Sequence, residues 1–169
     1  MDNITLSLIL SAIALLVSFI TFYLWNNSRQ SKKPQEAPFS TRPLQLQAYE
    51  RLVVLTERIA LPNLISRANQ PGLSTKEMQL LLLESIRQEF EYNSSQQIYV
   101  SPVAWQALNN LKEQNMLIIN QIAQTLPADA KGVDLNKRIM EVIMAQDKNA
   151  LHNIVLEALN YEARKLMKQ

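Results

Sequence analysis

The sequence predicts an all-α protein, in which a single N-terminal transmembrane helix is joined to a cytosolic bundle of about four to six helices. Three observations support this fold class. The run from Ile4 to Trp25 contains no charged residue. The chain has only 2 glycines and 7% aromatic residues, which disfavours sandwiches and barrels because these need glycine turns and aromatic cross-strand pairs. Helix-cap residues followed by helical apolar periodicity then recur along the rest of the chain.

The uncharged run is long enough to cross a bilayer. As a helix, Ile4 to Trp25 would extend roughly 33 Å, against a hydrocarbon core of about 30 Å. Tyr23 and Trp25 fall at its end, where aromatic rings favour the headgroup region. A cleavable signal peptide is the alternative, but no positive charge precedes the run and no small-residue cleavage site follows it. We therefore expect an uncleaved anchor over residues 1–26.

Basic residues lie on only one side of the expected anchor. Arg29, Lys32 and Lys33 follow it closely, whereas no lysine or arginine precedes it. By the positive-inside rule, the N-terminus lies outside and the C-terminal domain lies in the cytosol. The same cluster also falls within reach of anionic lipid headgroups, which makes a membrane-surface contact a second interpretation.

Small residues form one stripe along the expected anchor. They recur at steps of four, three, four and three: Ser7, Ser11, Ala14, Ser18 and Thr21. Such a stripe lets helix backbones approach closely in lipid, which favours a protein partner or a second copy of the chain. The alternative is that each hydroxyl bonds a carbonyl of its own helix, in which case no partner is needed.

Breaks in the remaining sequence divide it into a linker and several helices. Residues 27–41 are polar and contain two prolines, so we expect a flexible linker before an all-helical domain over residues 42–169. Helices are expected to begin near Pro43, at Leu61 beside Pro62, after Ser74 with Glu77 as a capping box, after Ser101 with Pro102, after Asp134, and after residues 147–149. Leu80 to Leu83 cover most of a helix circumference, which predicts that the helix after Ser74 is the most enclosed.

The sequence lacks the residues that several kinds of functional site require. There is no cysteine, which excludes disulfides and thiolate ligands, and the lone His152 has no neighbours at metal-ligand spacing. Two isolated glycines cannot build a glycine-rich phosphate loop. The net charge of +2 comes from mixed acids and bases, which predicts no binding to nucleic acid. We therefore expect no catalytic residues, no metal and no cofactor.

A polar residue interrupts the apolar pattern of the helix after Ser101. Asn115 falls at heptad spacing among five apolar positions: Ala104, Leu108, Leu111, Ile118 and Ile122. An asparagine in such a seam can fix register or oligomeric state by pairing with a partner. The simpler interpretation is a core amide that is satisfied within the domain.

The stretch from Glu89 to Val100 mixes acids, aromatic residues and amides between two expected helices. Together with Leu46–Glu50 upstream and Trp105 downstream, it resembles an uncharacterised family of single-pass membrane proteins from Bacteroidota-type bacteria. The similarity spans Leu44 to about Trp105. The resemblance implies a bacterial inner (cytoplasmic) membrane, and it brings no known activity and no functional residues.

Aromatic residues in and beside this stretch are candidates for an interface. Tyr92, Tyr99 and Trp105 have the rigid amphipathic rings that often anchor protein contacts. The alternative is an ordered interhelical loop whose amides cap helix ends.

These observations lead to a noncatalytic accessory, scaffold or assembly protein as the first hypothesis. It would use the lipid-embedded helix to join a membrane complex and present its helical domain to a protein partner. A membrane-tethered sensor that binds a small-molecule ligand is the second hypothesis, and the sequence does not identify such a ligand. An enzyme is third, because the carboxylates present lack a base, a nucleophile and a metal set.

Overall fold

The computed structural model describes residues 3–31, 40–145 and 151–168, and the regular elements in these residues are helical. They are α1 (Asn3–Ser31), α2 (Arg42–Ile59), α3 (Leu61–Ala68), α4 (Thr75–Tyr92), the 3₁₀ helix η1 (Ser94–Ile98), α5 (Pro102–Thr125), α6 (Gly132–Ala145) and α7 (Leu151–Lys168). The chain divides into two compact units, Met1–Ser40 and Thr41–Gln169. The all-helical class is therefore confirmed, and the described residues of the second unit form six α-helices.

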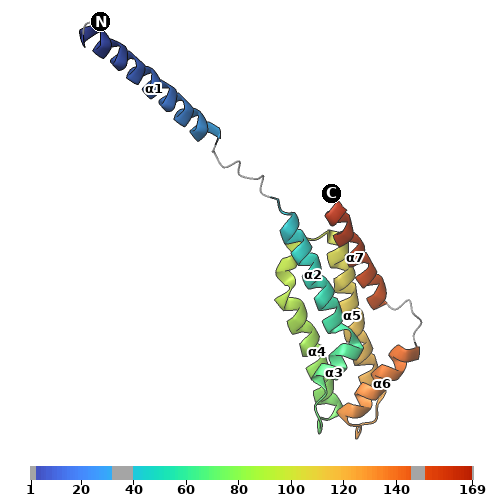
Figure 1. Ribbon diagram of the computed structural model, residues 1–169. Coiled ribbons are helices and arrows are strands. Elements are labelled where there is room, and N and C mark those ends of the chain that lie inside the picture. The colour runs from blue at the N-terminus through green and yellow to red at the C-terminus, as the bar shows by residue number, and fades with distance from the viewer. Residues whose placement is uncertain (1–2, 32–39, 146–150, 169) are drawn as a thin grey trace. The chain divides into compact units, whose positions relative to one another are not determined.

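The first unit contains α1, one uninterrupted helix (Figure 1). It continues past the expected end at Asn26 to Ser31, since no proline or glycine interrupts the polar residues that follow the apolar run. Side chains are described for Ser11 and for residues 13–26. Among the described residues, no helix has both the length and the apolar character needed to cross a membrane.

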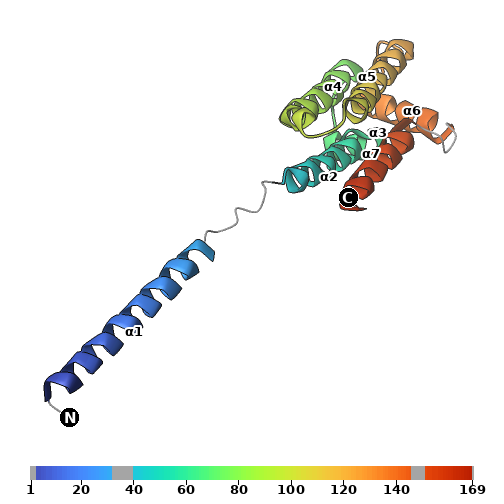
Figure 2. The same ribbon diagram turned by 90° about the horizontal axis from the view of Figure 1, so that it is seen from above.

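The second unit, which we call the helical unit, is built from four long helices that alternate in direction. Figures 1 and 2 show α2 beside α7 in one layer and α4 beside α5 in the other. The two layers meet where α2 contacts α4 and where α5 contacts α7. The short helices α3 and α6 pack on α4 and on each other at one end of the unit.

The hydrophobic core lies entirely within the helical unit, so this unit has the means to fold on its own. Its largest fully buried side chains come from five helices: Leu52, Leu55, Ile59, Leu64, Met78, Leu82, Ile86, Leu108, Leu111, Ile119, Leu135 and Ile139. The expectation that α4 is the most enclosed helix is wrong. Leu80 lies on an exposed face of α4, and α2 has more buried residues than α4.

Most of the expected helix starts are confirmed. The Ser74 hydroxyl accepts from the Glu77 N–H at 3.3 Å while the Glu77 carboxylate accepts from the Ser74 N–H at 2.9 Å, which is the capping box. Ser101 caps α5 by accepting from the Ala104 N–H at 3.1 Å. The start of α6 differs from the expected one by about one turn, because the helix begins at Gly132 and not after Asp134. The Asp134 carboxylate, now in the first turn, accepts from the Lys131 N–H at 2.8 Å.

Gly132 allows the start of α6 to lie against α4. Its N–H donates to the Leu73 carbonyl at 2.8 Å. A Cβ at this position would lie 2.8 Å from the Met78 Cβ and 3.2 Å from the Leu73 carbonyl oxygen. Since these neighbours belong to the backbone or stand next to it, they can move only if α6 shifts away from α4.

We expect Gly132→Ala to lower the free energy of unfolding by about 1–3 kcal/mol, because the added methyl overpacks the α4/α6 contact. Urea unfolding followed by circular dichroism would measure the change. Val133→Ala, on the exposed side of the same turn, is the matched control and should change stability by less than about 0.5 kcal/mol. Equal stability of Gly132→Ala and the parent chain would contradict the close approach.

Candidate functional site

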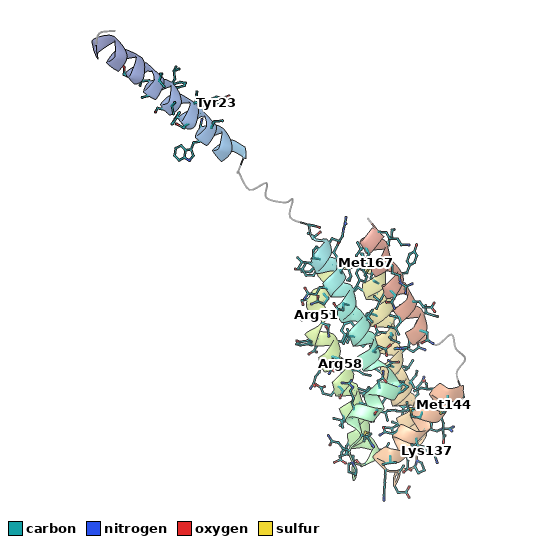
Figure 3. All side chains as sticks on the ribbon, in the orientation of Figure 1. Tyr23, Arg51, Arg58, Lys137, Met144 and Met167 are labelled. Carbon is teal, nitrogen blue, oxygen red and sulfur yellow. The ribbon has the colours of Figure 1, made fainter. Side chains whose placement is uncertain are left out.

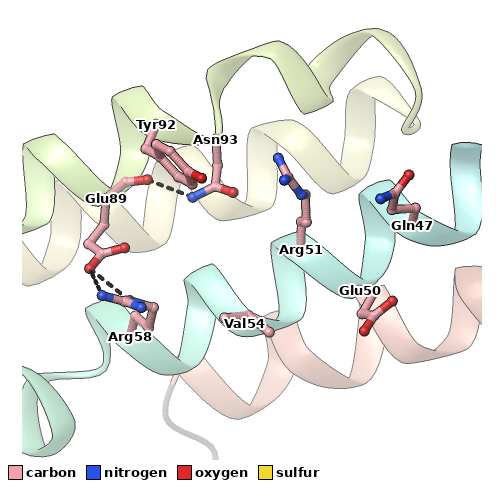
Figure 4. Close-up of a pocket in the computed structure, with 8 residues that line it drawn as sticks. All are labelled: Gln47, Glu50, Arg51, Val54, Arg58, Glu89, Tyr92 and Asn93. Atoms are coloured by element: carbon pink, nitrogen blue, oxygen red, sulfur yellow. Dashed lines mark hydrogen bonds and ion pairs between the residues drawn. The ribbon is translucent and has the colours of Figure 1, made fainter.

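Two grooves flank the segment that connects α4 to α5. The first, the α2/α4 groove, has a volume of about 280 Å³. It is lined by Gln47, Glu50, Arg51, Val54, Arg58, Glu89, Tyr92 and Asn93 (Figure 4). Its α2 residues Gln47, Arg51, Val54 and Arg58 recur at steps of four, three and four, which puts them on one helical stripe. The groove therefore combines exposed polar, cationic and apolar groups along one side of α2.

An ion-pair cluster closes one end of the α2/α4 groove. Glu89 Oε1 lies 2.6 Å from Arg58 Nη2 and 3.3 Å from Arg67 Nη1. Arg67 also donates to the Arg58 carbonyl at 2.6 Å, and so links α3 to the end of α2. Within the part of the chain that the structure describes, Arg51 has no ion pair, so its charge is directed to solvent.

Tyr92 stands over the same groove at the end of α4. Its side chain is 75% exposed, although it lies next to Asn93, whose amide donates to the Glu89 carbonyl at 2.8 Å and holds the helix end. The Asn93 bond therefore holds the backbone next to a ring that is largely open to solvent.

The second groove, the α2/α7 groove, lies on the other side of α2 and has a volume of about 540 Å³. It is lined by Gln45, Tyr49, Ile98, Tyr99, Val100, Ser101, Ala158, Tyr161, Glu162, Lys165 and Leu166. Exposed Ile98 and Tyr161 stand at its edges, and half-buried Val100 and Leu166 line it. Both grooves open to solvent, unlike the enclosed cavity expected for a ligand sensor.

A polar junction joins three helices beside the α2/α7 groove. The Tyr49 hydroxyl of α2 donates to the Glu162 carboxylate of α7 and accepts from the Ser101 N–H at 3.1 Å. The other carboxylate oxygen of Glu162 accepts from the Ser101 hydroxyl at 2.9 Å. Glu162 thus ties α7 to both α2 and the start of α5.

This junction changes the acidity of Tyr49. Burial raises the pKa of the Tyr49 hydroxyl above its ordinary value of 10.0, and the hydrogen bond to Glu162 raises it further. The bonds with Ser101 oppose this effect without cancelling it. The structure therefore favours the neutral phenol.

The three aromatic interface candidates occupy different surroundings. Tyr92 is exposed over the α2/α4 groove, and Tyr99 is half-buried beside the α2/α7 groove. Trp105 is half-buried against Phe90, with ring centroids 5.0 Å apart, so it packs α5 on α4. Of the three, only Tyr92 presents a largely uncovered ring.

Asn115 lies inside the helical unit and is not a surface contact. Its amide donates to the Ile59 carbonyl at 2.8 Å, at the last residue of α2. Helix-terminal carbonyls lack a partner within the helix, so the asparagine satisfies a group that the break at Ala60 exposes. This corrects its role as an interface candidate.

The residues expected to act in the membrane are only partly described. Ser11, Ala14, Ser18 and Thr21 have exposed side chains on α1. The Thr21 hydroxyl donates to the Val17 and Ser18 carbonyls at 2.9 Å each, so it is satisfied within its own helix. Lys32 and Lys33 lie outside the described residues, and the side chains of Ser7 and Arg29 are likewise outside the description.

No cluster of three or more histidine, cysteine or acidic residues suited to a metal ion occurs among the described residues. His152 Nε2 lies 3.8 Å from Glu57 Oε1, a single long contact between α7 and α2. Sequence reasoning missed the arginines of the α2/α4 groove. The stripe of Gln47, Arg51, Val54 and Arg58 was the available signal, but it resembles any solvated helix face until Tyr92 is placed beside it.

Comparisons with known proteins identify the family to which the chain is similar, and they indicate no activity. The model of a family of unknown function (DUF7935) matches residues 2–166. No curated protein and no solved structure matches the chain significantly.

We expect the unfolding free energy to fall as the pH rises above 10.0, because Tyr49 then ionises in the unfolded chain but keeps its proton in the fold. The contribution is fully present below that pH and is lost as pH rises through the folded pKa. Tyr49→Phe should reduce the steepness of this fall by at most about 1.4 kcal/mol per pH unit. Urea unfolding from neutral to alkaline pH would measure it.

Tyr49→Phe should also lower stability near pH 7 by roughly 1–2 kcal/mol, because the Glu162 carboxylate and the Ser101 N–H lose a partner. Tyr92→Phe is the control, since it removes a hydroxyl from an exposed ring. If Tyr49→Phe were as stable as Tyr92→Phe near pH 7, the junction would make no contribution to stability.

Proposed function

The chain belongs to the DUF7935 family from residue 2 to residue 166, and we propose that it is a noncatalytic, membrane-anchored accessory or assembly protein. In this proposal, α1 holds the chain in the bilayer and the helical unit binds a protein partner. The family match includes both parts, which supports a function that needs them together.

The anchor part of the proposal is carried by the uncharged run from Ile4 to Trp25. This run falls within α1, which is continuous from Asn3 to Ser31. A charged side chain at the bilayer centre is unfavourable by about 2.5–3.5 kcal/mol, so a run without any charge is what an anchor requires. By the positive-inside rule, the basic residues after the run favour an orientation with the N-terminus outside and the helical unit in the cytosol. The resemblance noted above favours the inner membrane of a Bacteroidota-type bacterium.

Contacts within the membrane would use the small-residue face of α1. Ser11, Ala14 and Ser18 leave little bulk on one side of the helix, which allows another helix to approach closely. Thr21 contributes its small side chain only, because its hydroxyl is already bonded within α1. A partner helix or a second copy of the chain fits this face.

Contacts in the cytosol would use the α2/α4 groove, and the exposed Tyr92 ring is the observation that carries this part. Tyrosine and arginine are among the residue types that dominate binding energy at protein interfaces. Arg51, which has no ion pair among the described residues, offers a planar donor on the same helical stripe, and exposed Val54 supplies an apolar group next to it. A partner segment with acidic and apolar side chains matches this set.

The noncatalytic part rests on chemistry that the sequence lacks. The chain has no cysteine and a single histidine. The hydroxyls of Tyr49 and Ser101 and the carboxylate of Glu162 at the α2/α5/α7 junction are already used in bonds that join helices. They therefore have a structural role that needs no substrate.

We expect the full chain to stay with membranes through an alkaline carbonate wash, because the apolar run of α1 remains in lipid. Leu15→Arg with Leu16→Arg should release most of it, since two central charges oppose insertion by roughly 5–7 kcal/mol. Immunoblotting of pellet and supernatant measures the outcome. Val133→Arg, which adds charge to the exposed face of α6, is a control that should not release the chain. A parent chain found in the supernatant would overturn the anchor.

We expect Tyr92→Ala to lower the affinity for a copurifying protein partner at least about tenfold, as the loss of an interface anchor typically does. The measurement is native mass spectrometry of complexes extracted in mild detergent. Tyr161→Ala is the matched control, because Tyr161 is 70% exposed and lies outside the α2/α4 groove. Equal loss in both variants, or a parent chain that runs only as a monomer, would reject the groove as a binding site.

A further inference from the structure

Exposed apolar side chains gather at the end of the helical unit where α2 begins and α7 ends. We call this the tether end, and define it as the first turn of α2, η1, the first turn of α5 and the last two turns of α7. Ile98 of η1 is 72% exposed, Val103 of α5 is 75% exposed and Tyr161 of α7 is 70% exposed. The α2/α7 groove brings Gln45, Ile98 and Tyr161 together, so these elements share one surface.

Positively charged residues lie on the α7 side of this surface, and Lys165 lines the α2/α7 groove together with Ile98 and Tyr161. The last two turns of α7 carry Arg164, Lys165 and Lys168, and their only acid, Glu162, is occupied by Tyr49 and Ser101. The acids Glu50 of α2 and Glu91 of α4 also lie near this end, Glu50 beside the α2/α4 groove. Cations at a helix C-terminus complement the helix dipole, which accounts for their sign. That effect does not account for the exposed Ile98 and Tyr161 beside Lys165.

The chain itself keeps this end close to a bilayer if α1 is in lipid. Residues 32–41 connect Ser31 to Arg42, and ten residues span at most roughly 36 Å. A surface held at this range meets lipid at a high effective concentration, so weak contacts are enough to hold it there. Tyrosine rings and lysine stems are also suited to the interface, where an apolar body and a polar tip are both satisfied.

From this combination we propose that the tether end docks on an anionic lipid surface, with Ile98 and Tyr161 entering the headgroup region and the α7 cations contacting lipid phosphates. The proposal rests on the proposed membrane anchor. It leaves the α2/α4 groove, whose lining shares no residue with the α2/α7 groove, open to a protein partner. Met144 of α6, which is 81% exposed and lies toward the opposite end of the helical unit, serves as the comparison (Figure 3).

The test uses the full chain reconstituted into vesicles. Since the chain lacks cysteine, single thiols at Ile98→Cys, Tyr161→Cys and Met144→Cys can carry a fluorophore. Quenching by brominated phosphatidylglycerol should be strong at positions 98 and 161 and weak at 144. Quenching at positions 98 and 161 should be weaker when the brominated lipid is neutral phosphatidylcholine. It should also weaken when the salt concentration rises from about 0.1 M to about 1 M, because the screening length then shortens from about 10 Å to about 3 Å.

Charge variants separate docking from anchoring. Arg164→Gln with Lys165→Gln and Lys168→Gln should lower the docked-to-undocked ratio by about fivefold for each charge. The matched control replaces three lysines at the opposite end: Lys76→Gln, Lys131→Gln and Lys137→Gln. Equal quenching at all three labels, equal quenching in neutral lipid, or crosslinking of position 98 to a protein in place of lipid would overturn the docking. A chain that does not float with vesicles after an alkaline wash would instead reject the anchor.

Discussion

Buried apolar side chains of α2 contact both layers of the helical unit, and the other helices are arranged around this contact. Leu52, Leu55 and Ile59 are fully buried, and each contributes about 1.5–3 kcal/mol through the hydrophobic effect. α2 packs beside α7 in its own layer and reaches α4 and α5 in the other. Because only one face of α2 is buried, its two flanks border the two grooves. The grooves are a direct consequence of the packing.

Two interior polar side chains, Asn115 and Tyr49, satisfy backbone groups at helix ends. Asn115 bonds the carbonyl at the end of α2, and Tyr49 accepts from the N–H of the residue that caps α5. Each helix terminus leaves backbone groups without intrahelical partners, and a buried terminus must find them elsewhere. Glu162 extends the same arrangement to α7. Asn115, an interface candidate in the sequence, is thereby explained as a joint between α5 and the end of α2.

The proposed functions divide the surface of the helical unit between two kinds of partner. The α2/α4 groove offers tyrosine and arginine, which suit a structured protein contact. The tether end offers apolar tips and lysines, which suit a lipid surface. The linings of the α2/α4 groove and the α2/α7 groove share no residue, so a protein and a lipid surface would use different side chains.

The sequence by itself determined where most helices begin and end. The break at Pro62, the Ser74–Glu77 capping box and the Ser101–Pro102 start depend on residues within four positions of each other, and such local interactions can be recognised directly in the sequence. It did not determine which face of a helix is buried when apolar residues surround it. In α5 the fully buried isoleucine is Ile119, not the expected Ile118, and in α4 the exposed leucine is Leu80.

Only the tertiary structure decided which distant residues meet. Tyr49 and Glu162 are separated by 113 positions, and Arg58 and Glu89 by 31. Periodicity shows that each of these residues lies on a helix, but the contact depends on how the helices cross and on their relative rotation. Those quantities are set by the packing of whole apolar faces, which no single segment encodes.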